Sequence, residues 1–339
     1  MKTQLKEFRK GLAERTLEFL WRQWDALGVA GTTPPETRRV IDPEALLLAT
    51  ATIARWDPRL FDEVLDWLLR NGRYINGIRL KRMLKHYGFV GQRVLAVASA
   101  MLKKKDRRRN WRIVSPQEAP EEALFFLSDG RPMAGWGPTD PTFAQYGFLR
   151  GRLELRGYSR SFTTNPSCIW LRLRALFGAS SRAEFILYLL LNAEGYPSDI
   201  ARKTGYTQKS GQDTMAEMAA SGFLHQTRKG REILYRLASP LWTQLAFDKK
   251  SAPAWILWPP LFRALEMIWL RLYDQGVYEL SDMGLTTELF ALMQKVRPLA
   301  EEAGIGHCLS PAGQGMGDDY LSVFMADVEN LLDYMTANE

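Results

Sequence analysis

The sequence has little of what secreted, disulfide-bonded and zinc-binding proteins use. Its 339 residues include two Cys, Cys168 and Cys308, and three His. Two Cys so far apart imply no disulfide framework, and the His and Cys residues lack the spacing of a zinc motif. We therefore expect no metal and no cofactor, and a reducing cytoplasm as the location of the protein.

Common catalytic signatures are also missing. The sequence contains no Walker loop, no His-Glu-x-x-His and no Gly-x-Ser-x-Gly pattern. A glycine-rich stretch at 313–317 has no strand pattern before it and is followed by Asp318 and Asp319, which would repel a phosphate. We interpret this stretch as a flexible loop and expect no catalytic residue. An enzyme with an unrecognised site, for instance a Cys–His pair, has the least support.

Long uncharged apolar runs are absent. The most apolar window, residues 252–270, is interrupted by Pro259, Pro260, Arg263 and Glu266. It therefore predicts a turn and a buried helix rather than a membrane span. The first residues of the sequence are charged where a signal peptide needs an apolar run. We expect no membrane partner.

Charge, by contrast, is plentiful and unevenly distributed. The formal net charge is +7, yet from Ser281 onward there are ten acidic and two basic residues. Residues 1–280 thus carry 43 basic against 28 acidic side chains. A basic region of this size favours a polyanionic partner such as double-stranded DNA. The acidic, helical C-terminal region could instead serve a protein partner.

The densest basic run is residues 103–112, with seven basic residues and one acidic residue. One interpretation is an arm that grips phosphates; the other is a solvated linker that ends an N-terminal domain. Both interpretations stay open. The candidate phosphate contacts in this run are Lys103, Lys104, Lys105, Arg107, Arg108 and Arg109.

Residues 181–237 carry the most informative pattern. A nearly continuous apolar run at 185–191 predicts a helix buried at the centre of a small bundle. A short second helix follows and ends at Gly205, where glycine favours a helix stop. Thr207 is the expected N-cap of a third helix, which ends at Gly222.

The third helix has two different faces. Met215 and Met218 recur at helical spacing and should face the first helix. Near the N-terminal end, the outward face is polar. A helix that reads DNA presents this end to the bases, where Gln can bond adenine and Lys can reach guanine or phosphate. The candidate readers are Gln208, Lys209, Ser210 and Gln212.

A two-stranded hairpin is predicted after the third helix. Leu224 lies at the start of one strand, and Ile233, Tyr235 and Leu237 alternate along the other. A turn at Gly230 joins them. Basic side chains beside this turn suit phosphate or minor-groove contacts. They are Arg228, Lys229 and Arg231.

Helix, short helix, turn, helix and hairpin follow each other in the order of a winged helix-turn-helix. Residues 181–237 resemble the ArsR and MarR repressor families in this respect. The resemblance implies DNA binding through the third helix and the hairpin wing, and it implies a homodimer on a pseudo-palindromic site. It covers residues 181–237 alone.

Two residues depart from the family pattern. Gly211 stands where the families usually have an apolar residue, and Gly lowers helix propensity by about 1 kcal/mol relative to Ala. Asp213 puts a negative charge on the outward face, where it would repel phosphate although it could accept a bond from cytosine. These residues favour an alternative in which the winged domain is an adaptor that holds a protein partner, as in an antitoxin or a phage-defence component.

Residues 42–88 also predict three helices with short links. Asp42-Pro43 is expected to open the first and Asp57-Pro58 the second, each as an N-cap followed by Pro at the first position. Arg79, Lys81, Arg82 and Lys85 are expected on the exposed side of the third. A second helix-turn-helix is one interpretation. An ordinary helical bundle with a solvated basic face is the favoured one, because no hairpin pattern follows. A further helix at 169–177 is expected to lead into the winged domain with Arg172 and Arg174 outward.

The fold class that follows is mainly α. We expect a multidomain helical protein with a central winged helix-turn-helix that carries a small β-hairpin wing. We expect an N-terminal helical domain at 1–112 and an irregular connection at 113–166. The winged domain follows at 167–240 and a C-terminal helical domain at 241–339.

The last helix, about 320–335, is strongly amphipathic. Its apolar stripe could pack on its own domain or form the dimer contact that the resemblance implies.

Taken together, the sequence predicts a DNA-binding transcriptional regulator of the cytoplasm that acts as a homodimer.

Overall fold

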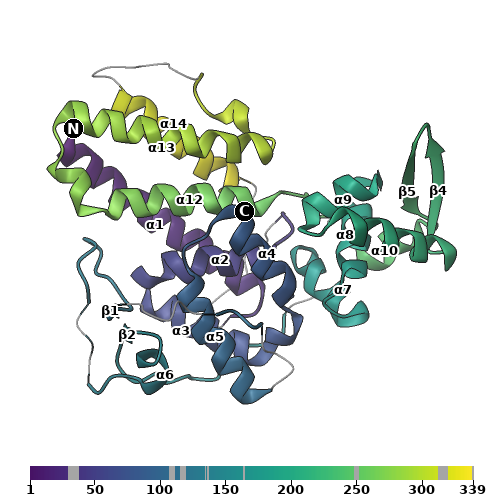
Figure 1. Cartoon of the computed structure of the whole chain (residues 1–339), viewed down its shortest axis with the longest axis horizontal. Helices are drawn as coiled ribbons and strands as arrows, with labels where there is room; N and C mark the ends of the chain where they lie inside the picture. Colours follow the sequence, from purple (N-terminus) through teal and green to yellow (C-terminus); the bar gives the residue numbers. More distant parts are fainter. Residues whose placement is uncertain are drawn as a thin grey trace.

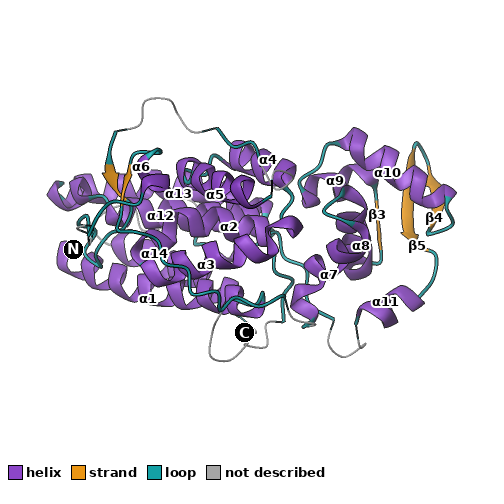
Figure 2. Cartoon of the chain, turned by 90° about the horizontal axis from the view of Figure 1, so that it is seen from below, coloured by secondary structure: helices purple, strands orange, loops and turns teal. Residues whose placement is uncertain are grey.

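The structure is a computed structural model, and it is mostly helical with a small antiparallel sheet. Figures 1 and 2 show a large helical part, here called the body, and a smaller part at one end, here called the module (residues 169–247). Each part has a hydrophobic cluster of its own. The residues that the structure describes are 1–29, 38–106, 111–114, 120–133, 135, 137–162, 165–247, 252–311 and 320–337.

The body is built from helices at both ends of the chain. Short 3₁₀ turns lie at 54–56, 72–74, 166–168, 275–279 and 306–308. The long helices of the body are α1 (Lys2–Ala26), α2 (Pro43–Ile53), α3 (Pro58–Asn71), α4 (Gly77–Tyr87), α5 (Gln92–Lys105), α12 (Trp258–Tyr273), α13 (Asp282–Glu302) and α14 (Tyr320–Thr336).

Local capping explains where the early helices begin. The carboxylate of Asp42 accepts a bond from the amide of Ala45 at 3.1 Å, and that of Asp57 accepts one from Leu60 at 3.0 Å. A proline occupies the first turn in both α2 and α3, where its missing N–H costs nothing. The predicted openings of these two helices are therefore confirmed.

One core joins the two ends of the chain. Phe19 of α1 packs against Trp258 and Phe262 of α12, with ring centroids 5.7 and 6.0 Å apart. The same cluster contains buried residues of α2, α3, α13 and α14. The expected N-terminal and C-terminal domains therefore share one core, because neither set of helices covers its apolar faces alone.

The segment between α5 and the module is irregular, as predicted. Its regular pieces within the described residues are β1 (Glu122–Ala123), α6 (Pro141–Ala144) and β2 (Phe148–Leu149), and the two strands pair in parallel. The segment lies against the body rather than free in solvent. Arg150 forms a bidentate pair with Asp62 at 2.6 and 3.0 Å.

The amphipathic last helix, α14, packs within its own chain. Phe324 and Leu331 are 0 % and 1 % exposed and belong to the body core. The helix contacts α13 and α1, and Figure 1 shows it beside α13. Of the two interpretations left open by the sequence, packing on its own domain is the one observed for the apolar stripe.

The helix expected in the apolar window at 252–270 is present as α12. It begins at Trp258 with Pro259 and Pro260 in its first turn, and most of its residues are buried in the body core. Within the described part of the chain, no helix combines the length and the apolar composition that crossing a membrane requires.

The module contains five helices and a three-stranded sheet among its described residues. Strand β5 lies between β3 and β4, and both pairings are antiparallel. The elements are α7 (Ile169–Phe177), α8 (Ser181–Asn192), β3 (Glu194–Gly195), α9 (Pro197–Thr204), α10 (Gln208–Ala220), β4 (Leu224–Lys229), β5 (Glu232–Leu237) and α11 (Leu241–Ala246).

The hairpin β4–β5 has a burial pattern that differs from the predicted alternation. Ile233 is 39 % exposed, whereas Leu234 and Tyr235 are 7 % and 3 % exposed. Ile233 is therefore not buried with Tyr235, although the two residues lie at alternate positions of the same strand. Tyr235 pairs with Gly195 of β3, so the second half of β5 is covered by the rest of the module. Ile233 lies nearer the exposed tip of the hairpin.

Two arginines expected to face solvent are buried. Arg79 of α4 and Arg174 of α7 are each 1 % exposed. Arg79 donates to Asp42 at 2.7 Å and to Glu44 at 2.7 Å. The predicted exposure of both arginines is wrong, because their carboxylate partners lie on other helices that helical periodicity cannot relate to them.

These charges form one buried network that joins the module to the body. Arg174 donates to Glu44 of α2 at 2.6 and 2.8 Å and to Glu184 of α8 at 3.0 and 2.6 Å. Arg79 also donates to the carbonyl of Thr204, at the end of α9, at 2.6 Å. Bonds between buried charges are costly to break, so the network fixes the module on α2 and α4.

The network contains three carboxylates and two guanidinium groups, counting Asp42. Burial raises the pKa of Glu184 to about 7, against the opposing effect of Arg174 and Arg79. Burial would also raise the pKa of Glu44, but Arg174 and Arg79 hold it below its usual value. Because negative charge is in surplus, one proton stays in the network well above the ordinary range of a carboxylic acid.

Candidate nucleic-acid interface

Helix α10 begins where the sequence predicts. The hydroxyl of Thr207 accepts a bond from the amide of Ser210 at 3.3 Å, which caps the first turn. On the inner face, Met215 and Met218 are 0 % and 5 % exposed and pack in the module core. The cap and the apolar stripe therefore determine which face of α10 is left outward.

Gly211 lets α10 lie close to α9. A Cβ atom at this position would be 2.7 Å from the carbonyl oxygen of Pro197 and 3.0 Å from the Cβ of Ala201. These distances are shorter than van der Waals contact. The glycine that weakens the helix by propensity is thus required by the crossing of the two helices.

The candidate readers on α10 lie on its outward face. Gln208, Lys209 and Gln212 are exposed, and Ser210, whose amide is bonded by the cap, is half-buried. Lys209 makes no ion pair among the residues that the structure describes. Three polar side chains are therefore available to a ligand along the first turns of the helix.

The hairpin turn is also exposed. Arg228, Lys229 and Arg231 all lie in solvent around Gly230, whose φ of 63° is in the left-handed region. Arg228 donates to the carbonyl of Gly230 at 3.3 Å, and Lys229 is opposite Glu232 in the strand register. The tip thus presents three cations with one carboxylate beside them.

Helix α10 and the hairpin form one end of the molecule. Strand β4 follows α10 directly and packs against it. In both Figure 1 and Figure 2 the hairpin lies at the end farthest from the body. No part of the body shown in either view covers the hairpin, so a large partner can approach it.

The basic run at 103–112 lies elsewhere. Lys103, Lys104 and Lys105 are exposed in the last turn of α5, and Lys104 donates to the hydroxyl of Thr142 at 3.3 Å. Cations at this end of a helix are favoured by its dipole. Figure 1 places α5 in the body, apart from the hairpin. The remaining candidates, Arg107, Arg108 and Arg109, lie outside the described residues, as does the glycine-rich stretch at 313–317.

A cleft that the sequence did not indicate adjoins the start of α10. It has a volume of about 390 Å³ and lies between α4, α9 and the start of α10, with Asp199 and Glu302 also in its lining. Arg82, Arg202 and Gln208 line it. Arg82 donates to the carbonyl of Gly205 at 2.6 Å, so α4 adds a cation beside the first turn of α10. Only the tertiary contact between α4 and α9 brings these residues together.

Acidic side chains limit the positive surface. Asp213 is exposed one residue beyond Gln212, and Glu217 pairs with Arg182 at 2.5 Å on the following turn. The outward face of α10 is therefore polar and cationic at its start and acidic toward its middle. A polyanion would be repelled by the second part.

Among the residues that the structure describes, no three His, Cys, Asp or Glu side chains are grouped so that they could hold a metal ion.

Comparisons of the chain with protein-family models, with curated proteins and with solved structures give no match.

Proposed function

We propose that the module is a winged helix-turn-helix and that the protein binds duplex DNA with it. In this proposal α9 and α10 form the helix-turn-helix, and β4–β5 is the wing. The first turns of α10 enter the major groove and the wing tip contacts phosphates, which is the docking geometry of such domains. The function that follows is transcriptional regulation.

One observation carries the proposal. The polar first turns of α10 and the cationic turn of the hairpin are both exposed at the same free end of the molecule, while the opposite face of α10 is buried. A polar outward face is ordinary for a surface helix, and it is the exposed cationic turn beside it that suits a phosphate-rich partner. The close crossing at Gly211 supports the helix-turn-helix part of the proposal.

A homodimer is part of the proposal. Two modules related by a two-fold axis would contact two half-sites one helical turn apart. The stripe of α14 is already covered by its own chain, so the dimer contact would use another surface. A cytoplasmic location accompanies this function.

The readers on α10 are tested by the double variant Lys209→Ala with Gln212→Ala. A bidentate base contact discriminates against the wrong base by about 1–3 kcal/mol. We expect the variant to lose preference for a sequence selected by the wild-type protein, while its affinity for random duplex changes little. Fluorescence anisotropy with selected and random duplexes measures both quantities.

The matched control is Gln294→Ala with Lys295→Ala, an exposed pair of the same residue types on α13. This control should keep the wild-type preference. An equal loss of affinity on every duplex for the α10 variant would mean that these side chains are not readers.

The wing is tested by Arg228→Ala with Arg231→Ala. Each lost phosphate contact should reduce the slope of log affinity against log salt by about 1. Arg152→Ala with Arg156→Ala removes the same charge from exposed positions of the body. If the wing variant binds duplex as the control does, the wing has no place in the interface.

A second candidate function is an adaptor that binds a protein partner through the same face. The exposed Asp213 and the acidic second half of the α10 face favour it. For this function the acidic C-terminal region would be a further contact with a partner. Asp213→Asn distinguishes the two candidate functions, because it removes a negative charge from the α10 face. The variant should bind DNA more tightly and a basic protein partner more weakly.

A further inference from the structure

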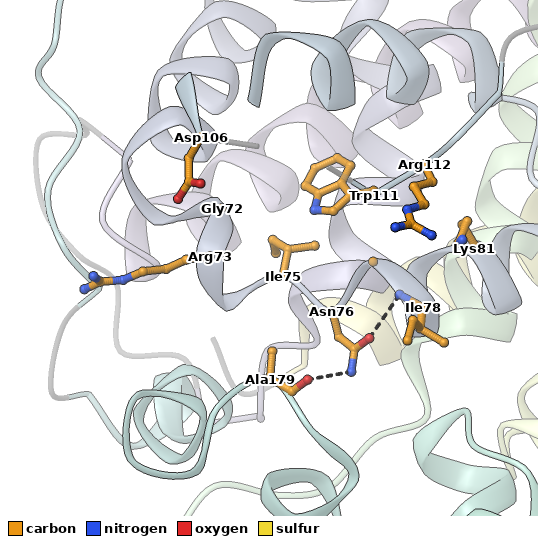
Figure 3. Close-up of a pocket in the computed structure, with 11 residues that line it drawn as sticks. Gly72, Arg73, Ile75, Asn76, Ile78, Lys81, Asp106, Trp111, Arg112 and Ala179 are labelled. Carbon is orange, nitrogen blue, oxygen red and sulfur yellow. Dashed lines mark hydrogen bonds between the residues drawn. The ribbon is translucent and has the colours of Figure 1, made fainter. Parts of the chain in front are cut away.

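Two hollows in the surface of the body differ in whether their polar groups already have partners. The larger has a volume of about 690 Å³ and lies at the start of α4, beside Trp111. Figure 3 shows Asn76 in its wall, with the side-chain amide donating to the carbonyl of Ala179 at 3.1 Å. Asp106 and Arg112 of this wall also interact within the chain. Most of its polar side chains are therefore unavailable to a ligand.

The smaller hollow is a cleft of about 180 Å³ between α3 and residues 154–156. The chain is attached to α3 on both sides of this segment. Arg150 pairs with Asp62 before it in the sequence, and the amide of Ser159 donates to Asp66 at 3.0 Å after it. Pockets that hold drug-sized ligands have volumes of about 300–1,000 Å³. A gap of this size therefore suits a small or slender ligand.

Two carboxylates in the walls of the cleft lack partners. Glu63 of α3 is 7 % exposed, and its Oε2 is buried with no hydrogen-bond partner among the described residues. Its Oε1 forms no hydrogen bond or ion pair with those residues either, and it is not enclosed as Oε2 is, so the carboxylate is open to the cleft. Glu154 is exposed on the facing segment and is unpaired within the described ranges. Burying a carboxylate without donors costs free energy, and a cationic ligand would remove that cost.

Two arginines also line the cleft, and they do not neutralise these carboxylates directly. The guanidinium of Arg59 lies over the ring of Trp21, 5.3 Å from its centroid. Arg156 is exposed. Neither arginine forms an ion pair within the part of the chain that the structure describes. A donor for the open carboxylate of Glu63 must therefore come from a ligand or from water.

The unpaired acidic side chains outnumber these arginines. Asp25 of α1 belongs to the same group, because its charge and that of Glu63 act on each other. Burial raises the pKa of Asp25 to about 6, where Arg59 opposes the rise and Glu63 adds to it. The acidic residues of this group that form no ion pair with a described residue are Asp25, Glu63, Asp66 and Glu154. Since Arg59 and Arg156 supply two positive charges, two negative charges remain for a ligand to balance.

The same surplus of negative charge acts on Glu63. Burial raises its pKa, and the charges of Asp66 and Asp62 act in the same direction, whereas Arg59 and Arg156 oppose the rise. A cation bound beside Glu63 would lower this pKa. Binding of a cation should therefore release protons and become tighter as the pH rises.

A compact ion does not match this arrangement. No three acidic, His or Cys side chains of the described ranges are grouped closely enough to hold a metal ion, so the carboxylates are better met by two separate charges. We propose that the cleft binds an aliphatic diamine, with one ammonium group beside Glu63 and the other beside Glu154. The alkyl chain lies along Pro58 and Leu155, which also line the cleft. Each ammonium group has three donors, and the carboxylate oxygens accept from them.

Isothermal titration calorimetry of the full chain with putrescine, a four-carbon diamine, tests the site without any nucleic acid. We expect saturable binding, about tenfold tighter than that of butylamine, which has one ammonium group. Glu63→Gln should weaken putrescine binding about tenfold, and Glu154→Gln, at an exposed position, about threefold. The matched control is Glu329→Gln, exposed on α14 and outside the cleft, which should bind as the wild type does.

The pH dependence gives a second readout. The wild type should bind putrescine about tenfold more tightly at about pH 8 than at about pH 5, because Glu63 and Asp25 are then more fully ionised. Glu63→Gln should make this difference smaller. Titrations in two buffers of different ionisation enthalpy measure the protons released on binding.

Absence of saturation by putrescine at millimolar concentration would overturn the proposal. So would equal affinity for butylamine, or equal affinity of the wild type and both cleft variants, each checked for wild-type thermal unfolding. Because Glu154 is exposed, its variant tests the cleft even if Glu63→Gln does not fold. Displacement of putrescine by an equal concentration of Mg²⁺ would show a metal site instead and also overturn the proposal. None of these outcomes depends on whether α10 reads DNA.

Discussion

Helices α4 and α10 are alike in position and unlike in environment. Each is the third helix of a triplet, each starts at a side-chain cap, and each has basic or polar residues at its start. In α4, however, Arg79 points into the core and binds Asp42 and Glu44. In α10 the corresponding polar residues are exposed at the end of the molecule.

The difference between the two helices lies in the rest of the chain. Buried carboxylates on α2 and α8 provide partners for arginines on α4 and α7. No such carboxylate faces Lys209 among the residues that the structure describes. A basic helix face is therefore available to a ligand only where the fold supplies no counter-charge. Variants of the two helices should differ in stability for this reason.

The largest effect is expected from Arg79→Met. The substitution keeps the bulk of the side chain but leaves Asp42 and Glu44 buried beside an apolar group. Breaking a buried ion pair in this way costs about 3–5 kcal/mol, and urea unfolding followed by circular dichroism measures it. Lys209→Ala on α10 should change the free energy of unfolding by less than about 0.5 kcal/mol. A loss below about 1 kcal/mol for Arg79→Met would remove the distinction between the two helices.

Local signals in the sequence predicted the helix starts. Asp42, Asp57 and Thr207 act as N-caps because a cap depends on residues two or three positions away. The exposure of the candidate readers on α10 likewise follows from its own apolar stripe. Neither inference needed knowledge of the rest of the fold.

Distant partners set the limit of such inferences. Arg174 is held by Glu44, 130 residues earlier in the sequence, so the pattern around Arg174 gave no sign of burial. Gly211 similarly looked unfavourable within its own helix, and only the crossing with α9 explains it. The cavity beside Trp111 depends on three separate segments and could not be predicted from any one of them.

The next effect in size is expected from Gly211→Ala. The new methyl group would meet the backbone carbonyl of Pro197, which cannot rotate away. Overpacking of this kind costs about 1–3 kcal/mol, partly offset by the gain in helix propensity of about 1 kcal/mol. Because the backbone carbonyl cannot yield, we expect the overpacking to exceed the gain, with a net destabilisation of up to about 2 kcal/mol in thermal unfolding. An unchanged or raised melting temperature would mean that α9 and α10 can move apart freely.

The smallest effect is a pH dependence that Glu184→Gln should remove. The pKa of Glu184 is about 7 in the folded chain and 4.5 is its ordinary value. Between these values the folded state binds more protons than the unfolded state, so the free energy of unfolding of the wild type falls as the pH rises. Gln stays neutral, so the variant should gain stability relative to the wild type as the pH rises through this range.

Denaturant unfolding of both proteins at about pH 5 and about pH 8 measures the difference. Comparison of the two proteins cancels the contribution of titrating groups that do not interact with Glu184. Parallel stability curves would show that Glu184 is ionised at both pH values, and that the proton is held elsewhere in the network.

The central claim is that the free end formed by α10 and the hairpin β4–β5 contacts the phosphates of a duplex. The most direct measurement is the affinity of the full chain for a mixed-sequence duplex over a series of salt concentrations. The account predicts a straight line of log affinity against log salt with a slope of about −0.9 for each phosphate contacted, made shallower by Arg228→Ala with Arg231→Ala. A flat line, or one whose slope is unchanged in that variant, would contradict it.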